Sequence, residues 1–359
     1  MLKTISVQDV TGLAKVHVAP ISVLVEVCYT CNENCIHCCV DEHKQVGLTI
    51  KQYEMLFDQM VKAGTFFVIL TGGEPFSRKD FMDIVRAARR RRISVTIFSN
   101  GTLITDQIVQ ELAALYVQDV HVSIYSVNEE THDRITRVPG SFRKSIAAIR
   151  TMRSAGITVR IKCPLMSLNA DEIDGIKELA LSLGAKIQFT TTITSKNDGD
   201  DSTHQLQMSS KQLLAAVNDQ SVIGSADPYM HSNNELECIP CDAILNGGAI
   251  DPAGNVYPCN QWRIKGGNVL EKEFGTIWKE SEAFIALRAI RLKDLSKCRS
   301  CDLFAYCTRC PGLALLEDHD ALGCSLAAQK VAIARKDSNI IPNQRHIFSE
   351  IPAKGGELK

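Results

Sequence analysis

Short apolar runs alternate with helical segments from about residue 21 onward, and this alternation restricts the fold more than any other feature of the chain. The runs are rich in β-branched residues, and the segments between them have helical periodicity. Repeated strand–helix units predict a parallel sheet, because parallel neighbours need a long crossover connection. We expect strands over 22–28, 66–70, 94–98, 119–125, 158–163 and 186–193, and helices over 50–63, 79–91, 105–115, 141–155 and 170–183.

Six such units predict an α/β fold with a partial, TIM-like (β/α)6 barrel, followed by a small cysteine-rich domain. In these folds the functional groups gather at the C-terminal ends of the strands. The lead-in is short and is expected to add at most a strand or a hairpin. The expected divisions are a lead-in over 1–20, a core barrel over 21–195, a bridge over 196–237 with a helix at 210–218, a cysteine-rich domain over 238–334 and an irregular tail over 335–359.

Charge and hydropathy exclude several classes of partner. The net charge is −1, so no overall field attracts the chain to nucleic acid or to an anionic membrane. No apolar stretch is long enough to span a bilayer, and the first residues lack the apolar core of a signal peptide. The sequence therefore predicts a cytoplasmic protein without a nucleic-acid or membrane partner.

The chain contains 14 cysteines, which is unusual for a protein of a reducing compartment. Disulfides are disfavoured there, so metal ligation is the first interpretation of the thiols. Their distribution separates two regions of the chain. Five lie early (Cys28, Cys31, Cys35, Cys38 and Cys39), Cys163 stands alone, and eight fall between Cys238 and Cys324.

Cys31, Cys35 and Cys38 form a C-x3-C-x2-C loop directly after the first expected strand. Three thiolates from one short loop can hold three corners of an iron–sulfur cube and leave the fourth iron open. A zinc site is the alternative, with His37 or Cys39 as the fourth ligand. Spacing alone favours the iron–sulfur cluster but leaves zinc open.

A second motif, Thr71-Gly72-Gly73-Glu74-Pro75, follows the second expected strand. The two glycines permit a close approach to the backbone, and Glu74 offers a carboxylate to a cationic group. Taken alone, the motif would indicate only a tight turn with a solvated glutamate. Because the preceding strand carries the cysteine loop, the two motifs are expected at one edge of the sheet.

Together, the two motifs resemble those of the radical S-adenosylmethionine (radical SAM) superfamily. The resemblance implies that Cys31, Cys35 and Cys38 hold a [4Fe–4S] cluster and that S-adenosylmethionine binds its open iron. Glu74 would lie near the methionyl amine, and His37 near the adenine. Reductive cleavage would then give a 5′-deoxyadenosyl radical that abstracts hydrogen from a substrate, with the chemistry carried by the cofactors.

The resemblance also implies contacts to S-adenosylmethionine at the ends of two later strands. Ser99 and Asn100 close the third expected strand, and Ser123 lies on the fourth. An arginine from the following segment would reach the carboxylate. Both Arg134 and Arg137 are candidates for that role, with a solvated surface charge as the alternative for either.

The C-terminal cysteines resemble the SPASM domain of peptide-modifying radical SAM enzymes, although the last pair is spaced by two residues where many members have three. Two fully ligated auxiliary clusters need eight thiolates, and eight are present. A pair of zinc ribbons is the alternative. The resemblance implies three [4Fe–4S] clusters in all, with auxiliary cluster I on Cys238, Cys241, Cys259 and Cys310, and auxiliary cluster II on Cys298, Cys301, Cys307 and Cys324.

Three cysteines remain outside these ligand sets. We expect Cys28 and Cys39 to be packed small residues beside the first cluster. Cys163 ends the fifth expected strand, and a buried thiol without a special role is favoured over a hydrogen-atom donor.

The resemblance covers residues 20–330 and extends to a branch that matures ribosomally made peptides. It implies a precursor peptide as substrate, a separate peptide-clasp (RRE) protein as partner, and a flavodoxin- or ferredoxin-type reductant. Two alternatives stay open at this point. One is a radical SAM enzyme that acts on a tetrapyrrole or on a sulfatase active-site residue, and the other is a non-enzymatic zinc-binding protein.

Overall fold

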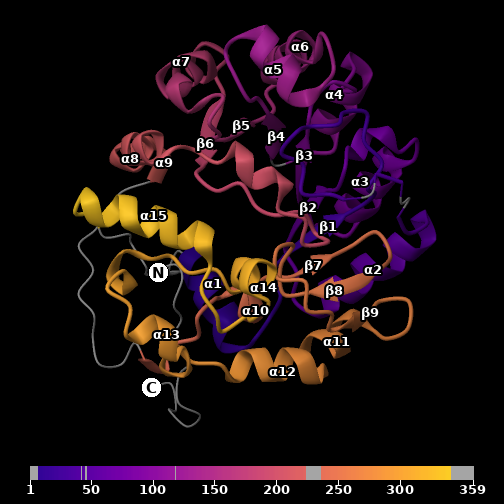
Figure 1. Ribbon diagram of the computed structural model, residues 1–359. Helices are drawn as coiled ribbons and strands as arrows, with labels where there is room; N and C mark the ends of the chain where they lie inside the picture. The colour runs from indigo at the N-terminus through magenta and orange to yellow at the C-terminus, as the bar shows by residue number, and fades with distance from the viewer. Residues whose placement is uncertain (1–6, 42, 45–46, 118, 224–235, 341–359) are drawn as a thin grey trace, which may run out of the picture.

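The structure is a computed structural model that describes residues 7–41, 43–44, 47–117, 119–223 and 236–340 (Figure 1). Its strands are β1 (Ser22–Glu26), β2 (Phe67–Thr71), β3 (Ser94–Ser99), β4 (Asp119–Ser123), β5 (Val159–Pro164), β6 (Lys186–Thr190), β7 (Ala249–Ile250), β8 (Asn255–Tyr257) and β9 (Gly267–Asn268). Its α-helices are α1 (Val7–Val16), α2 (Ile50–Lys62), α3 (Phe81–Arg90), α4 (Asp106–Ala114), α5 (Glu129–Thr136), α6 (Ser141–Ser154), α7 (Ile173–Ser182), α8 (Ser210–Asn218), α9 (Gln220–Ile223), α10 (Ala243–Asn246), α11 (Phe274–Glu280), α12 (Glu282–Ala289), α13 (Ser296–Arg299), α14 (Pro311–Asp318) and α15 (Leu326–Asp337).

The strands form one sheet in the order β6-β5-β4-β3-β2-β1-β7-β8-β9. Neighbours from β1 to β6 are parallel, and β7 pairs in parallel with β1, with Leu24 opposite Ala249. The strands β8 and β9 continue the sheet antiparallel. Because β6 and β9 lie at opposite ends of this order, the sheet does not close. This arrangement confirms the predicted α/β fold with a partial barrel.

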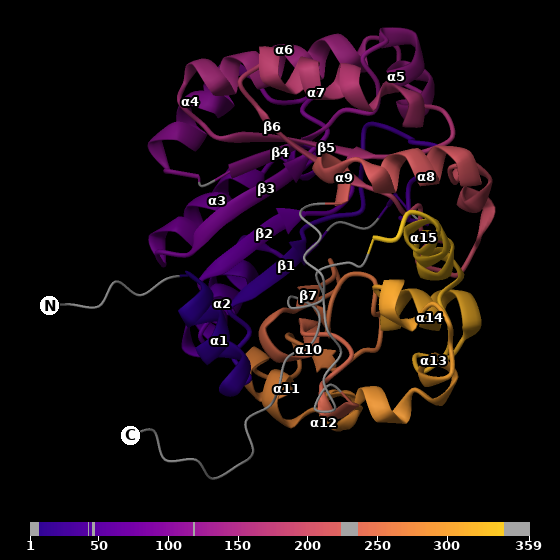
Figure 2. The same ribbon diagram turned by 90° about the vertical axis from the view of Figure 1, so that its left-hand side faces the viewer.

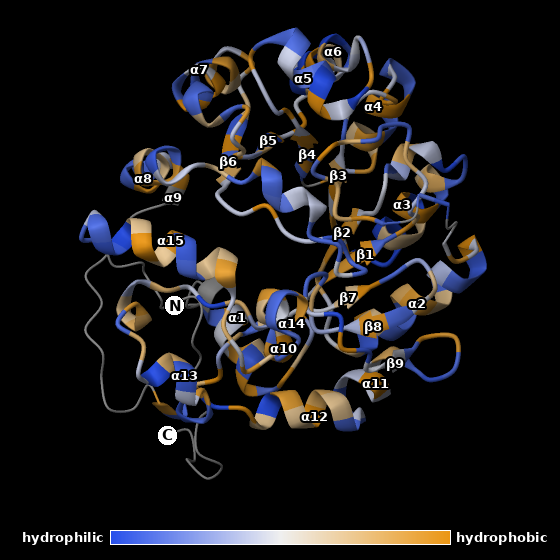
Figure 3. Ribbon diagram, in the orientation of Figure 1, coloured by the Kyte–Doolittle hydropathy of each residue, from blue (hydrophilic) through white to orange (hydrophobic). Residues whose placement is uncertain are grey.

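Side chains alternate between two environments along each core strand. In β1, Val23 and Val25 are fully buried beneath α2, where Tyr53 and Phe57 belong to the same apolar core. The other side chains of the strands face the lumen and are mostly half-buried. Figure 2 shows the helices of the core outside the sheet, and Figure 3 shows apolar residues concentrated on the strands. The open sheet therefore leaves its lumen partly accessible.

Local signals in the sequence explain where several helices begin. The Thr49 side chain accepts a hydrogen bond from the Gln52 backbone, and the Gln52 side chain bonds back to Thr49, which is a complete capping box before α2. Ser209 and Gln212 form the same arrangement before α8. These caps satisfy backbone N–H groups that have no partner inside the helix.

The C-terminal part of the chain packs against one side of the core. Helix α15 lies directly below α8 in both ribbon views (Figures 1 and 2), and a buried cluster joins them through Leu213, Val217, Val331 and Ala334. At the other end, β7 extends the core sheet from β1. The bridge segment therefore has a structural role, since its helix α8 carries the contact surface for α15.

Two expectations for the ends of the chain were wrong. Residues 7–16 form the helix α1 and not a strand or hairpin. The tail was expected to be irregular from residue 335, but α15 continues to Asp337. The remainder of the predicted tail from residue 341, like the first six residues of the lead-in, lies outside the described residues.

Candidate active site

The cysteine loop leaves β1 and rests on the end of α5. Backbone N–H groups of Asn34 and Ile36 donate to the carbonyl groups of Thr136 and Ile135, at 3.2 and 2.9 Å. The Cys38 N–H donates to the Cys35 carbonyl at 3.1 Å, which closes a turn inside the motif. Hydrogen bonds to α5, the helix that follows β4, thus hold the loop in a defined shape.

The three loop thiols lie close enough to influence one another's charge. Burial raises the pKa of Cys31 to about 12, and it also raises the pKa of Cys35 and Cys38. The negative charges of the neighbouring thiolates raise the pKa of Cys31 and Cys35 further. Without a bound cation these thiols are protonated at neutral pH, and three thiolates placed together suit a cationic iron–sulfur centre.

Glu33 is a buried carboxylate inside the loop that the sequence analysis missed. It is 4% exposed, and the Cys35 thiol donates to its Oε2 at 3.4 Å. Burial raises its pKa to about 7, and Oε1 has no hydrogen-bond partner among the described residues. The spacing of the cysteines carried no signal for this residue, because its burial depends on packing against α5.

Gly72 and Gly73 bring the end of β2 against the start of the cysteine loop. A Cβ atom on Gly72 would lie 2.1 Å from the Cys28 carbonyl oxygen, and one on Gly73 would lie 2.4 Å from the Thr30 carbonyl oxygen. The Gly73 N–H donates to the Cys28 carbonyl oxygen at 2.7 Å. The glycines are therefore required by the protein's own backbone, where the sequence had suggested the approach of a ligand.

Glu74 is fully buried and joins the ends of β2 and β3. Its Oε1 accepts from Ser99 Oγ at 2.9 Å and from the Phe76 N–H at 3.1 Å, and its Oε2 accepts from the Asn100 N–H at 2.7 Å. Burial raises its pKa to about 7, and these hydrogen bonds oppose the rise. The structure thus brings together three of the predicted site residues, Glu74 from the turn after β2 and Ser99 and Asn100 from the end of β3.

Asn100 connects this turn to the cysteine loop. Its Nδ2 donates to Asn32 Oδ1 at 2.9 Å, and Asn32 Nδ2 donates to Thr102 Oγ1 at 2.8 Å. Asn32 is the second residue of the motif, and the sequence analysis did not select it. These bonds link the first and third β/α units at the edge of the sheet where the predicted site lies.

An aromatic group covers the other side of the loop. The His37 ring meets the Tyr125 ring edge-on at 4.6 Å between centroids, and Tyr125 stacks on His132 at 5.3 Å. Burial lowers the pKa of His37 to about 4, so its imidazole is neutral at physiological pH. Its Nδ1 is buried and has no partner among the described residues. Ser123, at the end of β4, lies beside this group and hydrogen-bonds to the Tyr125 side chain.

The two candidate arginines have different positions. Both are exposed, but Arg137 lines a cavity shared with Cys35 and Cys38, whereas Arg134 lies on α5 outside that lining.

Lys162 on β5, which the sequence analysis missed, faces the lumen beside Ser123 in the neighbouring strand. Its Nζ lies 3.9 Å from the centroid of the Phe98 ring, and burial lowers its pKa to about 8. Two other cations are therefore better placed near the site than Arg134.

A cavity of about 480 Å³ separates the cysteine loop from the C-terminal region. His37 and Cys39 line it on the side of the loop, and Gln261, Leu313 and Arg335 line it on the C-terminal side. The remaining wall comes from the end of β6 and the segment after it, with several threonines. Cys39 is exposed to this space, so the expectation that it is a packed residue was wrong.

The remaining unassigned cysteines are buried and do not line the cavity. Cys28 is 0% exposed and belongs to the main core. Cys163 is 1% exposed and lies in a separate apolar cluster with Leu165 and Phe189. Both positions agree with a packing role.

Cys241, Cys259 and Cys310 form a second group of thiols. Burial raises the pKa of Cys241 to about 12 and that of Cys259 to about 11, and the three thiolate charges add to the rise. Cys238 is buried beside Leu292 and Leu295, in a cluster against which Cys298 packs. Its place as the fourth ligand of this group stays a prediction.

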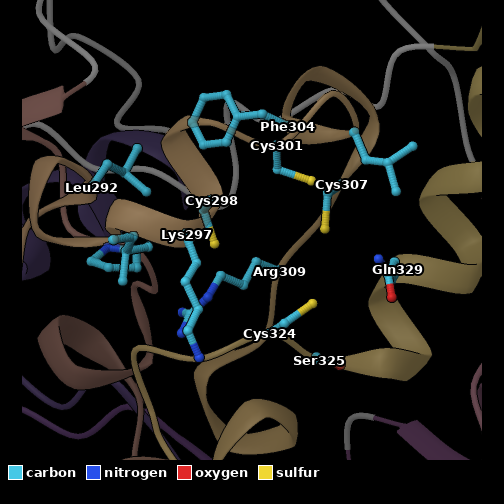
Figure 4. Close-up of a pocket in the computed structure, with 13 residues that line it drawn as sticks. Leu292, Lys297, Cys298, Cys301, Phe304, Cys307, Arg309, Cys324, Ser325 and Gln329 are labelled. Carbon is cyan, nitrogen blue, oxygen red and sulfur yellow. The ribbon is translucent and has the colours of Figure 1, made fainter. Parts of the chain in front are cut away.

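Cys298, Cys301, Cys307 and Cys324 form the third group and line one pocket (Figure 4). Leu292, Leu295 and Phe304 supply much of the rest of its wall. Burial raises the pKa of Cys307 to about 12, and the charges of the other three thiolates raise it further. Cys241, Cys259 and Cys310 do not line this pocket, and the assignment of the eight thiols to two auxiliary clusters stays a prediction.

The donor sets fit iron–sulfur clusters. Four thiols around one apolar pocket match a fully ligated cube, and three thiols on the loop match a cube with one open iron. No three Cys, His, Asp or Glu side chains of the described residues converge closely enough to hold a single metal ion. In a cube each thiolate binds a different iron, so such convergence is not required.

Cluster assembly is expected to improve as the pH rises from about 7 to about 9, because each thiol must lose its proton to bind iron. The raised thiol pKa values mean that the empty protein holds these protons throughout that range, so loading releases them. We expect iron and sulfide content under limiting iron to increase several-fold across this range. Equal loading at both pH values would contradict the raised thiol pKa values. A Cys163→Ala variant should show the same pH dependence as the wild type.

Comparisons with known proteins agree with this site. The model of the radical SAM superfamily matches residues 25–180, and that of the SPASM iron–sulfur cluster-binding domain matches residues 241–302. An AdoMet-dependent heme synthase of Methanosarcina barkeri is 29% identical over 332 residues, covering 85% of this chain and 95% of that protein. The mycofactocin maturase MftC of Mycolicibacterium smegmatis is 30% identical over 311 residues, covering 80% of this chain and 77% of that protein.

Solved structures show the same fold. The crystal structure of Streptococcus suis SuiB bound to precursor peptide SuiA superposes with a TM-score of 0.68 at 18% identity, covering 90% of this chain and 80% of that chain. The chain belongs to the radical SAM superfamily and carries a SPASM domain after the core. It is an enzyme whose cofactors include an iron–sulfur cluster and S-adenosylmethionine. No helix of the described residues is long and apolar enough to cross a membrane.

Proposed function

We propose that this enzyme cleaves S-adenosylmethionine reductively and abstracts hydrogen from a ribosomally synthesised precursor peptide, which it thereby crosslinks or otherwise modifies. The observation that carries the proposal is the 480 Å³ cavity between the cysteine loop and the C-terminal thiol groups. A substrate there would contact the loop through His37 and Cys39 and the C-terminal region through Gln261 and Leu313. MftC and SuiB, both similar to this chain, are a maturase and a peptide-binding protein by name.

When bound, the loop cluster and S-adenosylmethionine supply the 5′-deoxyadenosyl radical that takes a hydrogen atom from the substrate. The chain's own residues position the reactants. Cys31, Cys35 and Cys38 hold the cluster, and Glu74, Ser99 and Asn100 shape the pocket for the methionyl end. Ser123 and His37 lie on the side expected for the ribose and adenine.

The carboxylate of S-adenosylmethionine needs a cationic partner. We assign this role to Arg137 or Lys162 in preference to Arg134. Arg137 lines the cavity at Cys35 and Cys38. Lys162 lies in the lumen beside Ser123, where partial burial strengthens a charge–charge contact.

The cavity itself favours an anionic or neutral group of the substrate. Arg335 is its one cationic lining residue, and no carboxylate lines it among the described residues. Nη1 of Arg335 donates to the Tyr306 carbonyl oxygen and to Thr308 Oγ1, at 3.3 and 3.1 Å. The Nε atom is buried without a partner among the described residues, so the guanidinium retains capacity for an acceptor.

The proposal includes three [4Fe–4S] clusters and two protein partners. Eight C-terminal thiols supply ligands for two auxiliary clusters, with Cys238 completing the group of Cys241, Cys259 and Cys310. A separate peptide-clasp (RRE) protein would bind the leader of the precursor, and a flavodoxin or ferredoxin would deliver electrons.

A tetrapyrrole substrate is the second candidate, because the heme synthase of Methanosarcina barkeri is 29% identical and is covered over 95% of its length. Arg335 would then face a propionate in place of a peptide group. Both candidates use the same radical step and differ only in what the cavity holds.

Anaerobic turnover distinguishes the two candidates. The reconstituted, dithionite-reduced enzyme is incubated with S-adenosylmethionine and either a synthetic precursor peptide with its clasp protein or an iron porphyrin that bears propionate side chains. We expect 5′-deoxyadenosine formation to rise with the peptide and mass spectrometry to show loss of a hydrogen pair. Deuterium uptake without that loss would indicate epimerisation. Turnover of the porphyrin alone would overturn the peptide proposal, and absence of 5′-deoxyadenosine in every arm would overturn both candidates.

A further inference from the structure

Arg309 lies at the junction of the two C-terminal thiol groups. It directly precedes Cys310, which belongs to the second group, yet its side chain lines the pocket of the third group. Figure 4 shows it between Cys298 and Cys324. Arg309 therefore adjoins Cys310 in the chain, while its side chain lies in the pocket of the third group.

The guanidinium of Arg309 is held mainly from one side of the pocket, and it also hydrogen-bonds to the Cys298 side chain. Its Nε and Nη2 donate to the Gly323 carbonyl oxygen, each at 3.1 Å, and Nη2 also donates to the Ala321 carbonyl oxygen. Its Nη1 is buried and has no hydrogen-bond partner among the described residues. A buried N–H donor without an acceptor is costly, so a group that accepts from Nη1 is expected in the complete protein.

The charge of Arg309 is not neutralised by a carboxylate. The ion pairs of the described residues do not include it, and the nearby Asp318 pairs instead with Lys297 at 3.6 Å. Burial raises the pKa of the thiols of Cys298, Cys310 and Cys324, and the Arg309 charge opposes the rise at all three. The field of this one cation thus reaches ligands of both groups.

We propose that Arg309 raises the reduction potentials of the two auxiliary clusters by placing a half-buried positive charge and the buried N–H donor Nη1 beside their thiolate ligands. The inference rests on the proposed function, since it requires the auxiliary clusters. A cluster gains negative charge when it accepts an electron, and a nearby cation or an N–H donor to sulfur stabilises that reduced form. The effect is larger for the cluster on Cys298, Cys301, Cys307 and Cys324, because Arg309 lines that pocket directly.

A potentiometric titration of the reconstituted enzyme, followed by electron paramagnetic resonance, tests the inference. In Arg309→Gln we expect the ratio of reduced to oxidised cluster at a fixed potential to fall at least tenfold for that cluster, or about 59 mV for a one-electron couple. The other auxiliary cluster should shift in the same direction by less. The loop cluster, recognised because its signal changes on adding S-adenosylmethionine, should not shift and serves as an internal reference.

Two further variants distinguish an effect of the Arg309 charge from a purely structural effect of its side chain. Arg309→Lys keeps the positive charge and should recover more than half of the shift. Lys297→Gln removes a charge from the same pocket lining, but its side chain is 67% exposed and screened by solvent, so no shift is expected. Unchanged auxiliary potentials in Arg309→Gln, or an equal shift in Lys297→Gln, would overturn the inference.

A measurement without mutation covers the case in which Arg309→Gln loses iron. In wild-type enzyme containing ¹⁵N-arginine, electron spin echo modulation of the reduced auxiliary clusters should show coupling to a guanidinium nitrogen. Absence of coupling would overturn the role of Nη1. A wild-type chain that binds no auxiliary iron would instead refute the proposed function, and this inference with it.

Discussion

Replacing Cys31, Cys35 and Cys38 together by alanine is expected to abolish cleavage of S-adenosylmethionine while the rest of the molecule stays folded. The three thiols are the ligands that we propose for the open cluster, and they lie on a loop held by backbone hydrogen bonds to α5. The eight C-terminal thiols lie on other segments of the chain, so the variant should retain about eight of about twelve irons. Iron and sulfide analysis and chromatography of 5′-deoxyadenosine measure the two effects.

A Cys163→Ala variant is the matched control. It also removes a buried thiol, but from an apolar cluster outside the loop, so it should keep all irons and the cleavage activity. Cleavage by the triple variant, or loss of all its iron, would contradict the separation of the sites.

Replacing Arg263 by methionine is expected to lower the free energy of unfolding by about 3 to 5 kcal/mol, because it leaves Glu26 as an unpaired buried carboxylate. Nη2 of Arg263 lies 2.8 and 3.0 Å from the two carboxylate oxygens of Glu26, and Nη1 donates to the Tyr29 hydroxyl at 3.3 Å. Glu26 ends β1, just before the cysteine loop, whereas Arg263 follows Cys259. Urea denaturation under anaerobic conditions measures the loss.

Lys272→Met supplies the control for that prediction. Lys272 pairs with Glu280 at 3.7 Å, and both side chains are more than half exposed, so its loss should cost less than about 1 kcal/mol. In a double-mutant cycle, adding Glu26→Gln to Arg263→Met should recover part of the stability, since the unpaired charge is then removed. Equal effects of Arg263→Met and Lys272→Met would show that burial of the pair is unimportant.

The core strands and most core helices were predictable because their signals are local. A strand such as β3 is a short β-branched run, and a helix such as α2 has apolar periodicity and a capping box at Thr49. Helix α5 was missed because Ile135 is its single apolar residue, so no apolar periodicity marks it. Its start depends on the Asn128 cap and its end on Arg137 in the left-handed conformation.

The sequence predicted those site residues that belong to one local motif. It did not predict those that reach the site from distant segments of the chain. Cysteine spacing identified the loop, and the glycine motif identified Glu74. The roles of Arg263 and Lys162 depend on contacts with distant segments, namely Glu26 on β1 and Phe98 on β3. Arg335 likewise reaches the cavity only because α15 packs against α8. No local pattern distinguishes such residues from ordinary surface charges.

The pairing of β7 with β1 has a consequence for how the protein is made. β1, the strand that leads into the cysteine loop, has β2 on one side and β7 on the other, and β7 begins only at Ala249. During synthesis, the first six strands can assemble while that edge of β1 is still bare. Contacts between such distant positions form slowly, and uncovered strand edges promote aggregation. We therefore expect the edge of β1, the strand that leads into the cysteine loop, to stay open to misassociation until the segment with β7 has been synthesised.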